Sequence, residues 1–239
     1  MNTDTNKTFI IFGASGGIGK GMTKHLLETG NNVVISSRTK SDLEALALPF
    51  NQNNVLIAPA DASNQEQVKD VFRKAVEKFS KVDAVIISIG EWKKLFLNAS
   101  DTEDQETTER DYQLFFKTPK NVIKTAIDYF KTIGKGLIVN ISSHAAIKPE
   151  LTGNQSYGPM KAAIHHYIKS LPHEFNEHGI TGIRVTDLMP AAVDTGKFIL
   201  SDEQQLKTIK PEELSQWILD HFNDPNIPIA QLFDKGLVL

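Results

Sequence analysis

The residues most suited to chemistry are Tyr157 and Lys161, which lie four positions apart in a segment with a helical pattern. This spacing places both side chains on one face of a helix. A tyrosine ordinarily loses its proton near pH 10. An ammonium group about 4 Å away, at an effective dielectric near 20, would favour the phenolate by up to about 4 kcal/mol, or roughly three pK units. The pair is therefore predicted to exchange a proton near neutral pH, as general acid–base catalysis requires.

A serine hydroxyl is expected beside this pair. The apolar run from Leu137 to Ile141 predicts a buried strand, and Ser142 and Ser143 follow it directly. A hydroxyl at the carboxyl end of such a strand can donate a hydrogen bond to a substrate carbonyl and polarise it. We assign this role to Ser143.

A glycine-rich turn near the start of the chain predicts a dinucleotide site. The apolar strand Thr8–Phe12 leads into a G-x-x-x-G-x-G turn, and a helix is expected from there to about Thr29. Free N–H groups at a helix N-terminus attract phosphate, and glycines let a pyrophosphate approach the backbone. The residues assigned to this contact are Gly13, Ser15, Gly16, Gly17, Ile18 and Gly19.

The end of the second expected strand, 32–37, distinguishes between the two nicotinamide dinucleotides. Ser37 and Arg38 stand there and no acidic residue does. A guanidinium fork matches a phosphate, whereas a carboxylate would repel it. We predict NADP(H) rather than NAD(H), with Ser37 and Arg38 holding the 2′-phosphate; the alternative is a solvated Arg38. Asp61, after the third strand, is expected to contact the adenine or to cap the next helix.

Strand-like and helical patterns alternate along the chain, which predicts an α/β fold. We expect one Rossmann-type, doubly wound parallel sheet in a single domain spanning residues 1–239. Further strands are expected at 55–58, 82–89, 137–141 and 183–188, with an edge strand at 227–232 that contains Pro228; helices are expected at 41–48 with Ser41 as N-cap, 65–79, 107–132, 157–178 and 211–222.

Composition excludes several classes of protein. The 239 residues are 40% hydrophobic, carry a formal net charge of −3 and include no cysteine. Disulfides and thiolate metal sites are thereby excluded, and no nucleic-acid or membrane surface is indicated. The acidic run 101–106, with Glu109 and Asp111, is interpreted as a solvated loop leading into a helix, over a metal or partner role. We expect a soluble, cytoplasmic protein with no metal site, the adjacent His165 and His166 included.

Taken together, these segments resemble the short-chain dehydrogenase/reductase family, in its compact single-domain branch, up to about Thr195. The matching pieces are the glycine turn 13–19, Asp61-Ala62, Asn140-Ile141-Ser142-Ser143, Tyr157-Gly158-Pro159-Met160-Lys161 and the segment 190–195. The resemblance implies that Tyr157 is the acid/base, that Lys161 lowers its pKa and holds the nicotinamide ribose, and that Ser143 orients the carbonyl. It also assigns cofactor contacts to Ala62, Ser88, Gly90, Pro190, Val193 and Thr195. The segment 36–39 resembles that of NADPH-preferring carbonyl and xylulose reductases.

The sequence departs from the family pattern at several points. Of the usual Asn-Asn-Ala-Gly only Gly90 remains, and the asparagine expected in the long fourth helix falls on Phe116. Gly16 stands where NADP-binding members often carry arginine, and Ala191 replaces a glycine. The gap from Ser143 to Tyr157 is one residue longer than is usual in the family, so Ser142 remains an alternative candidate for the catalytic serine.

The predicted function is an NADP(H)-dependent oxidoreductase acting on a small carbonyl or alcohol by a Ser-Tyr-Lys mechanism, in a homodimer or homotetramer. The altered positions keep two alternatives open: a catalytically weak NADP(H)-binding protein acting through partners, and an isomerase or epimerase. Substrate contacts are expected from the segment 191–210, with Trp92, Phe96, His144 and residues 197–209 as candidate walls.

Overall fold

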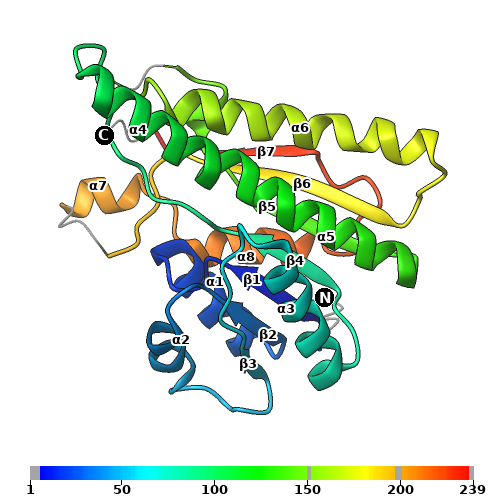
Figure 1. Cartoon of the computed structure of the whole chain (residues 1–239). Helices are drawn as coiled ribbons and strands as arrows, with labels where there is room; N and C mark the ends of the chain where they lie inside the picture. The colour runs from blue at the N-terminus through cyan, green and yellow to red at the C-terminus, as the bar shows by residue number, and fades with distance from the viewer. Residues whose placement is uncertain (1–5, 150–151, 197–200, 237–239) are drawn as a thin grey trace.

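A seven-stranded, fully parallel sheet forms the centre of the protein, in the strand order β3-β2-β1-β4-β5-β6-β7 (Figure 1). This computed structural model describes residues 6–149, 152–196 and 201–236. The strands are β1 (Thr8–Phe12), β2 (Asn32–Ser36), β3 (Val55–Ile57), β4 (Ala84–Ile87), β5 (Gly136–Ile141), β6 (Ile183–Pro190) and β7 (Ala230–Phe233). The predicted doubly wound α/β fold is confirmed.

Helices cover both faces of the sheet. They are α1 (Gly17–Glu28), α2 (Lys40–Ala47), α3 (Gln65–Phe79), α4 (Asp101–Tyr112), the π-helical turn η1 (Gln113–Lys117), α5 (Thr118–Ile133), the 3₁₀ turn η2 (His144–Ala146), α6 (Tyr157–Glu177), α7 (Asp202–Leu206) and α8 (Pro211–Asp220). Among the described residues, no helix is both long and apolar enough to cross a lipid bilayer.

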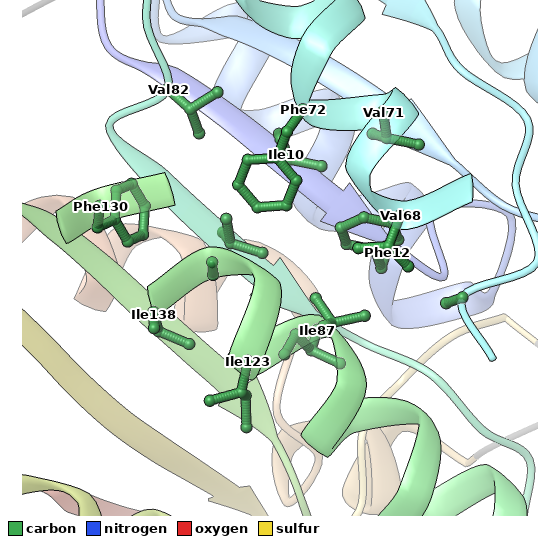
Figure 2. Packing of buried hydrophobic residues seen from close by; sticks show 14 of the residues in the cluster. Ile10, Phe12, Val68, Val71, Phe72, Val82, Ile87, Ile123, Phe130 and Ile138 are labelled. Atoms are coloured by element: carbon green, nitrogen blue, oxygen red, sulfur yellow. The ribbon is translucent and has the colours of Figure 1, made fainter. Parts of the chain in front are cut away.

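The sheet separates two hydrophobic layers because side chains alternate across each strand. On β1, Ile10 and Phe12 point into the layer beneath α3, α5 and α6, where Phe72 and Ile123 also lie (Figure 2). Phe9 and Ile11 point into the opposite layer, beneath α1, α2 and α8. Every residue of β1 is buried, as expected for a central strand of a two-sided parallel sheet.

The acidic run is helical, which corrects its interpretation as a loop. Helix α4 begins at Asp101 rather than near Thr107, and the Ser100 side chain caps it by accepting a hydrogen bond from the Glu103 N–H (3.3 Å). Acidic side chains in a first turn interact favourably with the helix dipole, so the negative charge favours the helix at this position. The long helix expected at 107–132 is two α-helical segments joined by η1.

Smaller differences occur at other element ends. Helix α2 begins at Lys40 with Thr39 as N-cap, so Ser41 lies inside the helix and the predicted Ser41 cap is wrong. Strand β4 is shorter than 82–89. The edge strand is confirmed as β7, which pairs with β6 and begins after Pro228, a residue that cannot donate a ladder hydrogen bond.

Candidate active site

The glycine turn lies between the carboxyl ends of β1, β2 and β4. Gly13 adopts φ +84°, and its N–H donates to the Ser36 carbonyl (2.9 Å). A Cβ on Gly13 would lie 2.2 Å from the Ser88 carbonyl oxygen, so no side chain fits there. Gly16 is the N-cap of α1 and has no side chain to occupy the first N–H groups of that helix. These groups are therefore free to bind an anion.

Residues from the far end of the chain reach the same turn. A Cβ on Gly17 would fall 2.4 Å from the Thr195 Cβ, so the Thr195 side chain rests against the turn. Val193 pairs with Ile209 in an isolated β-bridge, which ties the segment after β6 to the segment before α8. Part of the expected substrate-facing segment, residues 197–200, lies outside the described residues.

The ends of β2 and β3 carry the side chains assigned to the adenosine half. The Ser37 hydroxyl is buried without a hydrogen-bond partner among the described residues, and Arg38 is exposed beside it. Asp61 accepts hydrogen bonds from the Ser63 N–H (2.9 Å) and hydroxyl (2.7 Å), and these bonds, with the charge of Arg38, lower its pKa. The cap of α3 is Asn64, so the reading of Asp61 as that cap is wrong.

The structure brings Ser143, Tyr157 and Lys161 together where β5 ends and α6 begins. Lys161 lies one turn after Tyr157, with its Nζ 5.6 Å from the Tyr157 ring centroid and donating to the Ile141 carbonyl (3.2 Å). The Ser143 hydroxyl hydrogen-bonds with Tyr157 in a way that favours the phenolate. Ser142 instead donates to Asp187 Oδ2 (2.7 Å), so of the two serines only Ser143 faces the tyrosine.

Burial shifts the pKa values of the pair in opposite directions. It raises the pKa of Tyr157 to about 12 and lowers the pKa of Lys161 to about 8. Desolvation disfavours the charged form of each group, which explains both directions. Lys161 is not among the causes of the Tyr157 shift, so the expected lysine-induced fall in the tyrosine pKa stays a prediction.

Aromatic rings produce much of this burial. The Phe115 ring meets the Tyr157 ring edge-on with centroids 4.9 Å apart, and the Lys161 Nζ lies 4.8 Å from the Phe115 centroid. Trp92 lies on another side of Tyr157, with centroids 6.2 Å apart. Its indole Nε1 is buried and has no hydrogen-bond partner among the described residues. Trp92 thus lies against Tyr157, one of the candidate catalytic residues, as its place after Gly90 suggested.

Phe115, rather than Phe116, lies against Tyr157 and Lys161, the candidate catalytic pair. A Cβ on Gly90 would lie 2.1 Å from Phe115 Cε1, so the ring fills the space between Gly90 and Lys161. Phe116 packs outward between Tyr112 and Tyr167. Because both lie within η1, the wider π-helical turn rotates the following side chains relative to an α-helical count. The assignment of the missing asparagine to Phe116 is therefore corrected to Phe115.

Two buried carboxylates, Asp111 and Asp187, influence Lys161, which was not predicted from the sequence. Asp187 on β6 is fully buried and is contacted by Asn140 Nδ2 (2.8 Å), the Ser142 hydroxyl and His165 Nδ1 (2.8 Å). Asp111 at the end of α4 is also fully buried, in contrast to the solvated role expected for it. The available signal for Asp187 was an acidic residue within a predicted buried strand.

Comparison with known proteins identifies the family. A family model described as short chain dehydrogenase matches residues 7–205, so the chain belongs to the short-chain dehydrogenase family. An uncharacterized oxidoreductase of Staphylococcus aureus is 27% identical over 229 residues, covering 95% of both chains. Another, from Staphylococcus epidermidis, is 26% identical over 220 residues and covers 92% of both.

Solved structures show the same fold. A short chain dehydrogenase from Bacillus anthracis superposes with a TM-score of 0.82 at 24% identity, covering 96% of this chain and 95% of that one. An alcohol dehydrogenase from the archaeon Thermococcus sibiricus, complexed with 5-hydroxy-NADP, gives a TM-score of 0.76 at 22% identity, covering 96% and 97%. A 7α-hydroxysteroid dehydrogenase complexed with NADH gives 0.81 at 20% identity, covering 97% and 94%.

Proposed function

We propose that this short-chain dehydrogenase is an NADP(H)-dependent oxidoreductase that interconverts a small carbonyl compound and its alcohol. The observation that carries the proposal is the convergence of Ser143, Tyr157 and Lys161 at the carboxyl edge of the sheet. The glycine turn opens on the same edge, since Gly13 contacts Ser88 and the nearby Gly90 contacts Phe115, which touches Tyr157. In parallel sheets this edge is where ligands bind.

The residues present fit a dinucleotide with a 2′-phosphate. The glycine turn offers backbone N–H groups at the start of α1 for the pyrophosphate. The buried Ser37 hydroxyl has no hydrogen-bond partner within residues 6–149, 152–196 and 201–236, and the exposed Arg38 follows it in the chain. A phosphate between these two groups would satisfy the hydroxyl and pair with the guanidinium. Related folds bind both kinds of dinucleotide, so the preference for NADP(H) rests on Ser37 and Arg38.

The chemistry divides between the cofactor and the chain. The bound dinucleotide supplies a hydride to the carbonyl carbon, or accepts one from the alcohol carbon in the reverse direction. Ser143 donates a hydrogen bond to the carbonyl oxygen. As the C=O π electrons move onto that oxygen, Tyr157 gives it a proton and is left as the phenolate; in alcohol oxidation the phenolate takes the proton back. The Lys161 ammonium is placed to hold the nicotinamide ribose hydroxyls.

The test is NADPH oxidation by purified protein with a panel of aldehydes, ketones and quinones. Tyr157→Phe should lower kcat by about 100- to 10,000-fold, because it removes the proton donor, and should leave NADPH affinity within a few-fold. Tyr112→Phe removes a hydroxyl from a partly exposed ring on α4 and serves as the matched control. Turnover retained by Tyr157→Phe would refute the proposed mechanism.

A second candidate function is a catalytically weak NADP(H)-binding protein that acts through partner contacts. Phe115 favours it, because an apolar ring stands against Lys161 where the family carries a polar residue. Tight NADPH binding, with no turnover of any panel substrate by the wild-type protein, would support this candidate over the enzyme.

A further inference from the structure

Trp92 carries a buried hydrogen-bond donor that the fold does not use. Its indole Nε1 is shielded from solvent and has no hydrogen-bond partner anywhere in the part of the chain that the structure describes. A buried tryptophan N–H usually finds a partner, because leaving it unpaired costs stability. The indole N–H can donate but cannot accept, so the group it lacks is an acceptor.

The loop that carries Trp92 is held on both sides of this residue. Before it, the Glu91 carbonyl accepts a hydrogen bond from Arg110 Nη2 (2.8 Å). After it, Leu95 is buried, and its N–H donates to the Gly153 carbonyl (2.9 Å). The backbone at Trp92 is therefore positioned by the protein itself, without a ligand.

The same loop is joined to the start of α6. Leu95 pairs with Asn154 in an isolated β-bridge, and Asn154 Oδ1 accepts a hydrogen bond from the Gly158 N–H (2.8 Å) in the first turn of that helix. Tyr157 begins the helix, and its ring centroid lies 6.2 Å from that of Trp92. The indole donor and the candidate proton donor thus belong to one connected unit.

The other donors of the site define what the indole N–H could bind. The Ser143 hydroxyl hydrogen-bonds with Tyr157, and both groups are assigned to the oxygen of the reacting carbonyl. That oxygen has its donors without Trp92, so the indole N–H is available to a second acceptor on the same substrate. Because the Trp92 and Tyr157 rings contact one another, this second acceptor must lie close to the reacting carbonyl.

The second acceptor is expected to be neutral. The Lys94 ammonium lies over the Trp92 ring, 5.5 Å from its centroid, whereas an indole N–H bond lies in the plane of the ring. Lys94 is therefore placed against the face of the ring and not beside the N–H. A carboxylate at the N–H would give up its hydration for one hydrogen bond from a neutral donor, which is unfavourable.

We propose that Trp92 is a specificity-determining residue whose indole N–H selects substrates with a neutral oxygen acceptor next to the reacting carbonyl, such as a 2-keto ester or a 1,2-diketone. The inference rests on the reductase function proposed above. In reduction the hydride electron pair forms the C–H bond and the Tyr157 proton moves to the carbonyl oxygen, while the second oxygen accepts the Trp92 hydrogen bond without taking its proton. A simple ketone leaves that N–H unpaired and should be a poorer substrate.

The first test compares two substrates of equal chain length, the keto ester ethyl pyruvate and the simple ketone 2-hexanone. The measured quantity is the ratio of their kcat/KM values for reduction with NADPH. Trp92→Phe keeps an aromatic ring and removes the N–H, so this ratio should fall by about tenfold or more relative to the wild type. The greater intrinsic reactivity of the keto ester cancels in this comparison, and a loss of packing alone would affect both substrates alike.

Trp217→Phe is the matched control. Trp217 is the other of the two tryptophans in the chain and lies on α8, where its ring contacts those of His221 and Phe233. The same chemical change there should leave the substrate ratio unchanged. A wild-type ratio in a folded, active Trp92→Phe protein would overturn the proposal. A larger loss for pyruvate than for its ethyl ester would also overturn it, because the acceptor would then be a carboxylate.

The second test is made on the wild-type protein and needs no turnover. Protein labelled with ¹⁵N has two indole N–H signals, which are assigned by the loss of one in Trp92→Phe or in Trp217→Phe. In the presence of NADP⁺, which has no hydride to give, ethyl pyruvate should move the Trp92 proton signal downfield, as a hydrogen bond to oxygen does. Neither 2-hexanone nor the Trp217 signal should show this shift. A Trp92 signal that ethyl pyruvate does not move would refute the proposal.

The two tests separate this inference from the proposed function. If no carbonyl compound is reduced but ethyl pyruvate moves the Trp92 signal, the reductase function fails and the acceptor site stands. If the wild type and Trp92→Phe reduce both substrates in the same ratio, the reductase function stands and the inference about Trp92 fails.

Discussion

The glycine turn and the cluster of buried side chains around Tyr157 lie at the same edge of the sheet, but the turn is formed by backbone and the cluster by side chains. The turn is made of backbone: Gly13 and Gly19 pass so close to neighbouring main chain that a Cβ on either would lie 2.2 or 2.3 Å from a carbonyl oxygen. The Tyr157 cluster consists of side chains from distant segments, with Phe115 and Trp92 against Tyr157 and Phe115 also against Lys161. A backbone site can be recognised from a short motif, whereas a side-chain site depends on distant segments.

The largest expected effect comes from breaking the backbone site. Gly13→Ala should lower the free energy of unfolding by more than about 4 kcal/mol, because its Cβ would meet the Ser88 carbonyl in a conformation with φ +84°. Gly134→Ala is the matched control, since Gly134 has φ +75° with no atom within 4 Å of the added Cβ. It should cost about 1 kcal/mol, by urea unfolding. Equal costs would show that backbone conformation, and not the close approach, matters at Gly13.

Removing the Asp187 carboxylate should destabilise the fold nearly as much as Gly13→Ala. It should leave the glycine turn, and therefore NADPH binding, intact. Asp187→Ala leaves Asn140, Ser142 and His165 without their shared acceptor, at a cost of about 3 kcal/mol in urea unfolding. Asp187→Asn, which keeps the shape and one acceptor oxygen, should cost less. The folded Asp187 variants should still bind NADPH by fluorescence titration. A cost below about 1 kcal/mol for Asp187→Ala would mean that the cluster relaxes around the gap.

The burial of Lys161 also makes the free energy of unfolding depend on pH. The folded pKa of about 8 is below the ordinary value of 10.5, so the unfolded chain binds the proton more tightly. The wild type is therefore destabilised below pH 8, and the penalty disappears as the pH rises to 10.5. Lys161→Met should raise the free energy of unfolding by about 2 kcal/mol at pH 7, and the gain should vanish by about pH 10.5. A gain that does not change with pH would contradict this account.

The smallest effect is expected at the exposed Arg38, which follows β2. Arg38→Ala should lower the preference for NADPH over NADH, measured as the ratio of kcat/KM values, by at least about tenfold, because it removes the cation assigned to the 2′-phosphate. Lys40→Ala, which removes an exposed cation that pairs with Glu44, is the control. An unchanged preference in Arg38→Ala would remove the basis for the NADP(H) proposal.

The same contrast explains what the sequence could predict. The strand, turn and helix around Gly13, and the placement of Tyr157 and Lys161 on one helical face, follow from local spacing. The order of the sheet follows from the alternation of strands and helices. The convergence of Ser143 with that pair follows from the rule that parallel strands end at one edge.

The errors have nonlocal causes. The family resemblance pointed to Phe116, whereas Phe115 lies against Lys161; both lie in η1, where a π-helical turn changes which side chain faces inward. Asp111 looked like one of many surface acids, because its contact with Ser156 at the start of α6 joins segments that are far apart in the sequence. The strong burial of Tyr157 and Lys161 could not be foreseen, because rings from other segments contact them and no pairwise spacing reveals those rings.

The helix that follows the glycine turn packs against the last helix of the described chain. Gly21 on α1 faces Pro211 so closely that a Cβ there would lie 2.5 Å from the proline Cβ, and His25 Nδ1 lies 2.8 Å from the Ser215 hydroxyl. Met22 and Leu26 share one hydrophobic layer with residues of α8. During synthesis on a ribosome, the part of α1 that faces α8 therefore stays uncovered until α8 has emerged, although β1 and β2 cover the rest of its apolar face earlier. Nascent chains that stop short of α8 are expected to bind chaperones or aggregate.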